Sequence, residues 1–158
     1  SKREYLALVW GDLKKDFDTI DNYIGRNPKN RLQNMVLSDD NVILTGKRAI
    51  TNYEVISRFN YVSLVKCILE TGRTHQIRVH FSYKKNPLLG DKQYGKKNIK
   101  FKKINEDFLK KLSVLNGQAL HAKSLGFIHP SKNKWVNFES ELPKDFNKIL
   151  NLLINLCS

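Results

Sequence analysis

Five polar side chains that could contact an anion gather in the stretch Glu70–His80, E-T-G-R-T-H-Q-I-R-V-H. They are Arg73, His75, Gln76, Arg78 and His80. Like charges at this spacing repel one another on a helix, so the cluster is unfavourable as plain surface. Free N–H groups and the dipole at a helix start attract phosphate or carboxylate, and a guanidinium can hold a carboxylate through two hydrogen bonds. The stretch therefore predicts an anion-facing helix start; a solvated basic helix face is the alternative.

The histidines and cysteines do not predict a metal site. His75 and His80 are five positions apart, about 140° around a helix, which is poor for sharing one ion. Cys67 and Cys157 form no C-x-x-C pair, so neither a zinc site nor a redox motif is expected. Cys67 lies in an alternating apolar run and is expected to be a small buried hydrophobe. Reduced thiols fit a cytoplasmic protein.

The chain is strongly basic, with 158 residues, a formal net charge of +13 and a pI near 9.8. Such a balance indicates a polyanionic partner, and RNA, DNA or an anionic membrane surface would all qualify. An AT-rich genome, which raises the Lys and Asn content, is the alternative explanation. No apolar run approaches the roughly 18 residues that a membrane span needs. Lys29 and Arg31, in a basic segment before residue 35, could contact phosphates.

Several elements must position these side chains. Tyr5–Trp10 predicts a buried strand, and Tyr5 is either an edge-strand aromatic or a ring that stacks on a base. Thr19–Ile24 predicts a short strand, and Gly25–Asn34 predicts a polar, basic loop. Residues 42–44 are either a short strand or part of a longer loop.

The middle of the chain predicts a hairpin followed by a helix. Ala49–Phe59 and Tyr61–Leu69 both alternate between two faces, with Phe59-Asn60 between them, so two paired strands are expected. After Thr71-Gly72 the period changes, and Thr74 can cap a helix that runs to about Lys84.

The last third predicts two helices around a strand pair. A basic surface loop is expected at 95–103, a short helix at 105–115, and strands at 119–128 and 134–138. Pro143 suits the first turn of a last helix. Its apolar stripe comprises Phe146, Ile149, Leu150, Leu153 and Leu156. Together these elements predict one α+β domain, or a large part of one, with a mixed, mostly antiparallel sheet and packed helices.

Three segments in a fixed order resemble a known family. They are E-T-G-R-T-H-Q-I-R-V-H (70–80), N-P-L-L-G-D-K-Q-Y-G (86–95) and Q-A-L-H-A-K-S-L-G-F-I-H-P (118–130). They are similar to the pseudouridine synthases of the type that modifies large-subunit ribosomal RNA, and R-E-Y-L-A-L-V-W-G (3–11) fits the same family. Within that family the chain looks most like synthase D, with synthase C next.

The resemblance implies a fold, a reaction and roles for particular residues. The fold is a mostly antiparallel sheet around an RNA cleft. The reaction breaks the N-glycosidic bond of a flipped-out uridine, turns the base and rejoins it through carbon, without a cofactor. Tyr5 would stack on the uracil and take the proton from carbon, and Arg78 would pair with a catalytic aspartate. Arg73, His75 and Gln76 would shape the helix start near the RNA. The implied partner is ribosomal RNA of the large subunit or its assembly intermediate, and the protein is expected to be a monomer.

The sequence departs from the family pattern in one respect. The family's catalytic aspartate lies in an H-R-L-D-x-x-T-S-G segment before the Tyr5 strand, and residues 1–158 contain no such segment and no S4-like domain. We therefore expect the C-terminal part of a catalytic domain, from an enzyme that is active when intact. A non-catalytic RNA-binding module derived from the same fold is the alternative. Without the aspartate, Arg78 is expected to be an uncompensated cation.

Overall fold

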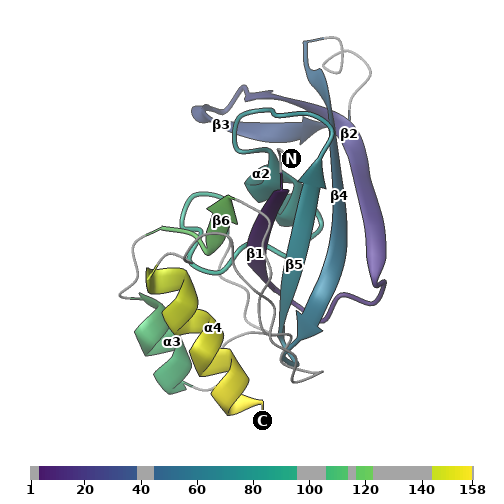
Figure 1. Ribbon diagram of the computed structural model, residues 1–158. Coiled ribbons are helices and arrows are strands. Elements are labelled where there is room, and N and C mark those ends of the chain that lie inside the picture. The colour runs from purple at the N-terminus through teal and green to yellow at the C-terminus, as the bar shows by residue number, and fades with distance from the viewer. Residues whose placement is uncertain (1–3, 39–44, 96–105, 114–116, 123–143, 158) are drawn as a thin grey trace.

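The computed structural model describes residues 4–38, 45–95, 106–113, 117–122 and 144–157. Six strands form one sheet in the order β3-β2-β4-β5-β1-β6 (Figure 1). The strands are β1 Glu4–Trp10, β2 Phe17–Asn27, β3 Asn30–Leu37, β4 Lys47–Arg58, β5 Val62–Leu69 and β6 Leu120–Ala122. Each pair of neighbouring strands is antiparallel. The predicted α+β class with a mostly antiparallel sheet is confirmed.

Helices pack on both faces of the sheet, and consecutive apolar side chains of β1 point to opposite faces. Leu6 and Leu8 point to one face, where they join a cluster with α3 (Glu106–Ser113) and α4 (Lys144–Leu156). Ala7 and Val9 point to the other face and pack with α2 (Gln76–Tyr83). Because both faces are buried, the middle of β1 is apolar at every position and does not alternate between apolar and polar residues.

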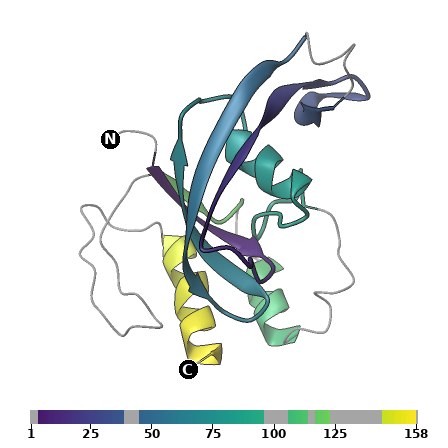
Figure 2. The same ribbon diagram turned by 90° about the vertical axis from the view of Figure 1, so that its right-hand side faces the viewer.

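The predicted loop at Gly25–Asn34 is wrong, because residues 25–27 end β2 and residues 30–34 begin β3 in a long hairpin, which leaves only Pro28 and Lys29 as its turn. The backbone ladder runs from Tyr23 paired with Leu37 to Asn27 paired with Asn30. Most side chains along β3 are exposed or half-buried, so the apolar alternation that marks a strand is missing. In both views the hairpin arches over α2 (Figures 1 and 2).

Helix α2 starts differently from the prediction. His75, not Thr74, is the residue before the helix; its φ of 57° is left-handed, and no side chain caps the end. The turn before the helix is fixed from inside instead, because Gln76 Oε1 accepts hydrogen bonds from the Arg73 amide (3.0 Å) and Thr71 Oγ1 (2.7 Å). The Thr74 cap is therefore wrong, although the helix itself is confirmed.

The other described elements follow the predictions. The hairpin of β4 and β5 is confirmed, and Asn60 in its turn has a φ of 63°. Helix α4 buries Phe146, Ile149, Leu150 and Leu153, whereas Leu156 is exposed. The predictions for 42–44, for 96–103 and for the strands beyond residue 122 lie outside the described residues. Among the helices described, none is long and apolar enough to cross a membrane.

Candidate functional site

The site is centred on an ion pair between Arg78, in α2, and Asp91. The guanidinium donates through Nε to Oδ2 and through Nη2 to Oδ1, both at 2.9 Å. The Asp91 side chain is fully enclosed and that of Arg78 is 12% exposed. The hydrogen bond to Asp91 raises the pKa of Arg78 above its ordinary value. The expectation of an uncompensated cation is therefore wrong, because the chain supplies its own carboxylate.

The Asp91 carboxylate is itself fixed by backbone hydrogen bonds. Its Oδ1 also accepts the backbone N–H groups of Gln93 (3.1 Å) and Tyr94 (3.0 Å). A buried carboxylate is tolerated when its oxygens are satisfied in this way. Gly90, just before it, has a φ of 77°, which side chains rarely adopt. The turn that carries Asp91 is thus fixed on both sides of the carboxylate.

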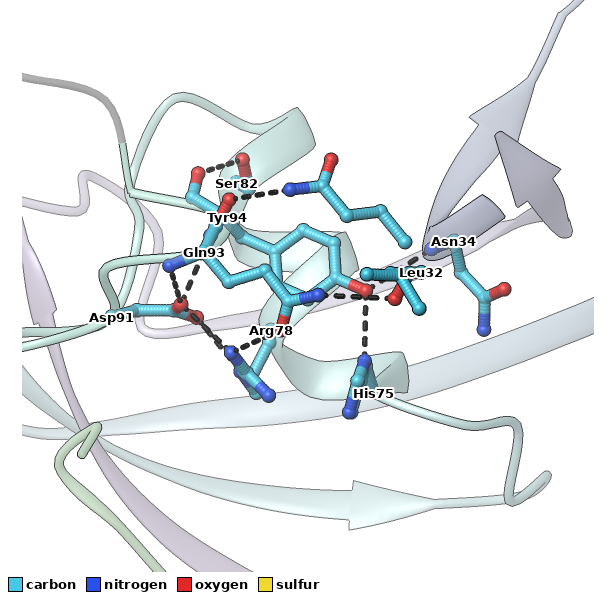
Figure 3. A network of polar contacts seen from close by, with 9 residues as sticks. Leu32, Asn34, His75, Arg78, Ser82, Asp91, Gln93 and Tyr94 are labelled. Carbon is cyan, nitrogen blue, oxygen red and sulfur yellow. Dashed lines mark hydrogen bonds and ion pairs between the residues drawn. The ribbon is translucent and has the colours of Figure 1, made fainter. Parts of the chain in front are cut away.

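Gln93 and Tyr94 surround the same guanidinium (Figure 3). Gln93 Oε1 accepts from Arg78 Nη2 at 3.1 Å, and the Arg78 guanidinium lies 4.9 Å from the Tyr94 ring centroid. The Tyr94 hydroxyl lies 2.8 Å from His75 Nδ1. Burial, and next the positive charge of Arg78, lower the pKa of His75. Both effects favour the neutral form of the His75 ring.

The guanidinium keeps donors for a further anion. An arginine has five N–H donors, and the contacts to Asp91 and Gln93 use one on Nε and two on Nη2. Within the described part of the chain, nothing accepts a hydrogen bond from Nη1. Arg78 is thus oriented and charged, with one amino group left for another acceptor.

A second, buried network lies behind the helix start. Thr71 donates to Gln76, whose amide Nε2 donates to Thr51 Oγ1 at 2.9 Å. The Thr51 hydroxyl lies 2.7 Å from His80 Nδ1, and His80 Nε2 lies 2.8 Å from Asn22 Oδ1. Each donor finds an acceptor if His80 is neutral with its proton on Nε2. Burial lowers the pKa of His80 to about 4, which agrees with that tautomer.

Tyr5 lies in the interior of the sheet rather than at its edge. It pairs with Cys67 of β5 and with Ala122 of β6, so the edge-strand alternative is wrong. Its ring is half-buried and packs against the cluster that contains Ile77 of α2. Tyr5 and the helix that carries Arg78 therefore belong to the same face of the sheet.

Of the other predicted residues, two are exposed on the hairpin and two lie near the start of α2. Lys29 and Arg31 are exposed at the tip of the β2–β3 hairpin. Arg73 is half-buried and its Nε donates to the Arg48 carbonyl at 2.9 Å. Gln76 is 2% exposed and bonded internally on both sides, so it shapes the helix start without facing solvent. Among the described residues, no group of three or more potential ligands could hold a metal ion.

Sequence reasoning missed Asp91, Gln93 and Tyr94 as parts of the site. A signal was available in L-G-D-K-Q-Y-G, because an aspartate after glycine often accepts the amide two or three positions later and so fixes a turn. The pairing with Arg78 could not be found in this way, because thirteen positions separate the two residues and no local rule joins them.

Comparison with known proteins identifies the family. Residues 1–83 match the model of the RNA pseudouridylate synthase family. The chain is 45% identical over 149 residues to the uncharacterized RNA pseudouridine synthase YlyB of Bacillus subtilis, covering 94% of this chain and 43% of the relative. It is 40% identical over 152 residues to ribosomal large subunit pseudouridine synthase D of Zymomonas mobilis, covering 96% and 45%. The chain thus spans less than half the length of these relatives.

Two solved human structures share the fold. RNA Pseudouridylate Synthase Domain Containing 1 superposes with a TM-score of 0.61 at 23% identity, over 96% of this chain and 64% of that one. Domain Containing 4 superposes with a TM-score of 0.66 at 24% identity, over 96% and 61%. The fold and the sequence matches together define a class of RNA-modifying proteins. The chain belongs to the RNA pseudouridylate synthase family.

Proposed function

We propose that this chain supplies Tyr5 and Arg78 to an active site that converts uridine to pseudouridine in large-subunit ribosomal RNA. The observation that carries the proposal is the state of Arg78, which is oriented by Asp91 and whose Nη1 meets no acceptor among the described residues. A relative named ribosomal large subunit pseudouridine synthase D supports the choice of RNA.

The proposed chemistry divides between two residues. A carboxylate from an H-R-L-D segment would bind Nη1 of Arg78, and the positive charge would keep that carboxylate ionised. The uridine, flipped out of its stack, would lie against the Tyr5 ring. The bond from the ribose to N1 breaks and the bond from the ribose to carbon 5 forms. Tyr5 accepts the proton released from carbon 5, and N1 takes up a proton from solvent, so that the product is an isomer of uridine. No cofactor enters this scheme.

The RNA would be held by the β2–β3 hairpin and by the region around α2. Lys29 and Arg31 at the hairpin tip would contact phosphates, whereas Arg73, His75 and Gln76 would maintain the shape of the helix start. The net charge of +13 favours such a polyanion. We also propose that the protein works as a monomer in the cytoplasm.

Tritium release from RNA labelled at carbon 5 of uridine tests the proposal. We expect release from the chain joined to the H-R-L-D region of a family member, and none from the chain alone. Arg78→Ala and Tyr5→Phe should each abolish release in the joined protein. Matched controls are Arg58→Ala, whose guanidinium pairs with Asp16 at the surface, and Tyr61→Phe, which is 56% exposed.

The possible results separate two functions. Normal release in either Arg78→Ala or Tyr5→Phe would refute the role assigned to that residue. Salt-sensitive RNA binding with no release from the joined protein would instead favour the non-catalytic RNA-binding module.

RNA affinity measured against salt tests the hairpin. Lys29→Ala with Arg31→Ala should lower the slope of log K against log salt by about 1.4, because each contact to a single strand contributes about 0.7. Lys110→Ala with Lys148→Ala removes two exposed charges from α3 and α4, on the other face of the sheet, and should leave the slope unchanged. An equal change of slope for the two pairs of substitutions would show that RNA binding depends on the total charge and not on the hairpin.

A further inference from the structure

We propose that Gln93 and Tyr94 are positioning residues that couple the β2–β3 hairpin to the guanidinium of Arg78. The inference extends the proposed function, on which its meaning for RNA modification rests. It links the surface expected to bind phosphates to the arginine expected to act in catalysis.

Apart from the turn at 91–94, one described hydrogen bond ties the hairpin tip to the rest of the molecule, from Asn34 Nδ2 to the Thr74 carbonyl at 2.8 Å. The ladder between β2 and β4 ends where Ile24 pairs with Lys47, so the chain beyond Ile24 has no partner in β4. Strand β3 is the last in the order of the described strands, among which it pairs with β2 alone. The tip, residues 25–34, is therefore held against the rest of the molecule mainly by side-chain contacts.

Those contacts reach the turn that follows α2. Gln93 Nε2 donates to the Leu32 carbonyl at 3.0 Å, and the Tyr94 hydroxyl accepts the Asn34 amide at 3.1 Å. The Gln33 side chain donates to the Gln93 carbonyl at 3.0 Å. The turn therefore contacts three consecutive residues of β3.

Gln93 and Tyr94 each have one part that contacts Arg78 and another that contacts β3. In Gln93, Oε1 accepts from Arg78 and Nε2 donates to Leu32. In Tyr94, the ring faces the guanidinium and the hydroxyl accepts a hydrogen bond from the Asn34 amide (Figure 3). A shift of β3 therefore cannot leave both contacts to Arg78 unchanged, and coupling of this kind acts equally in both directions.

The two functions of these side chains can be separated by substitution. Gln93→Glu keeps an oxygen for Arg78 but loses the donor to Leu32, and Tyr94→Phe keeps the ring but loses the hydroxyl. The double substitution, here called the link variant, thus keeps an oxygen and a ring against Arg78 and removes the two side-chain hydrogen bonds to β3. The bond from the Gln33 side chain to the Gln93 carbonyl remains in it. Ser82→Ala is the matched control, because Ser82 Oγ donates to the Tyr94 carbonyl (2.7 Å) from the helix side.

Hydrogen exchange of the Arg78 Nε–H, followed by NMR without RNA, is the first measurement. We expect exchange about fivefold faster in the link variant than in the native chain, the lower end of typical coupling between sites, and less than about twofold faster in Ser82→Ala. Equal rates in the native chain and the link variant would overturn the coupling. An equal acceleration in Ser82→Ala would do the same, because it would reflect a loosened turn.

The second measurement follows the same exchange after addition of a short oligouridine. If Gln93 and Tyr94 were purely structural, their substitution would not change the effect of the RNA. Binding at the hairpin should slow Arg78 Nε–H exchange in the native chain and leave it unchanged in the link variant. Protection of equal size in both proteins would indicate direct contact and would overturn the coupling. If the oligouridine does not bind, the proposed function is weakened, whereas the exchange rates without RNA still decide the coupling.

Discussion

Removal of the Asp91 carboxylate is expected to destabilise the fold more than removal of any surface carboxylate. Asp91→Ala would leave the Arg78 guanidinium, only 12% exposed, without its partner, and would also free the Gln93 and Tyr94 amides. Breaking a buried pair costs about 3–5 kcal/mol. Because Arg78 retains some contact with water, we expect a loss of about 3 kcal/mol in the free energy of unfolding. For a chain of this size the melting temperature should fall by about 6–12 °C.

The control is an exposed ion pair with a similar contact distance. Arg58 Nη2 lies 2.8 Å from Asp16 Oδ1, with the side chains 36% and 72% exposed. Water already solvates both groups, so Asp16→Ala should cost less than about 1 kcal/mol. The two pairs differ in burial and also in partners, because Asp91 accepts two backbone amides, whereas Arg58 keeps Asp12 at 3.6 Å when Asp16 is removed. Both differences should make the Asp91 substitution the more costly one.

Urea unfolding followed by circular dichroism provides the assay. A double-mutant cycle with Arg78→Met should show a coupling energy of about 2 kcal/mol between Arg78 and Asp91, since the second substitution removes the charge that the first one strands. If Asp91→Ala costs no more than Asp16→Ala, the buried pair does not hold this site together and the reasoning fails.

Two further predictions concern the surroundings of this pair. His80 has a pKa of about 4 when folded against 6.5 when unfolded, so the stability from keeping it neutral is complete above pH 6.5 and is lost as the pH falls toward 4. The free energy of unfolding should fall by about 3 kcal/mol over that range. Urea unfolding at a series of pH values should show a weaker pH dependence of this free energy for His80→Gln. An unchanged pH dependence would show that other groups dominate. Gly90→Ala should cost about 2 kcal/mol, because its φ is 77° and a Cβ would lie 2.5 Å from the Gly117 carbonyl oxygen. Gly117→Ala has a similar φ of 79° but open space around the Cβ, so thermal melting should show a smaller loss; equal losses would mean that the contact is unimportant.

The elements that bury a clear apolar face were the ones that the sequence predicted well. Strand β1, the hairpin of β4 and β5, and helix α4 all follow from the spacing of apolar residues. Strand β3 did not, because its exposed residues include Leu32 and its polar ones bind the turn at 91–94, so alternation carries little information there. Its extended form is set by pairing with β2 and by tertiary contacts.

Part of the site was predictable from the local sequence. The helix start that carries Arg78 stands out in the sequence because several basic and polar side chains crowd together. The left-handed His75 and the turn held by Gln76 did not stand out, because both depend on a network through Thr71 and Thr51 from two other segments. Local rules assign a cap to the nearest hydroxyl, whereas here no side chain caps the helix and the Gln76 side chain holds the turn before it.

The pairing of Arg78 with Asp91 changes how the absence of the H-R-L-D segment from residues 1–158 should be interpreted. An arginine without a carboxylate partner would be expected to swing into solvent, and the site would then have to form when the second carboxylate arrived. Here Asp91 and the Tyr94 ring already fix the guanidinium, so a second carboxylate would need to bind one amino group rather than organise the whole side chain. A loss of turnover in this chain alone would therefore reflect a missing reactive group in the proposed site, not a misplaced arginine. For the same reason, the Asp91 substitution should impair the joined protein even when the H-R-L-D carboxylate is present, since the Gln93 and Tyr94 amides would still lose the Asp91 oxygen that they bind.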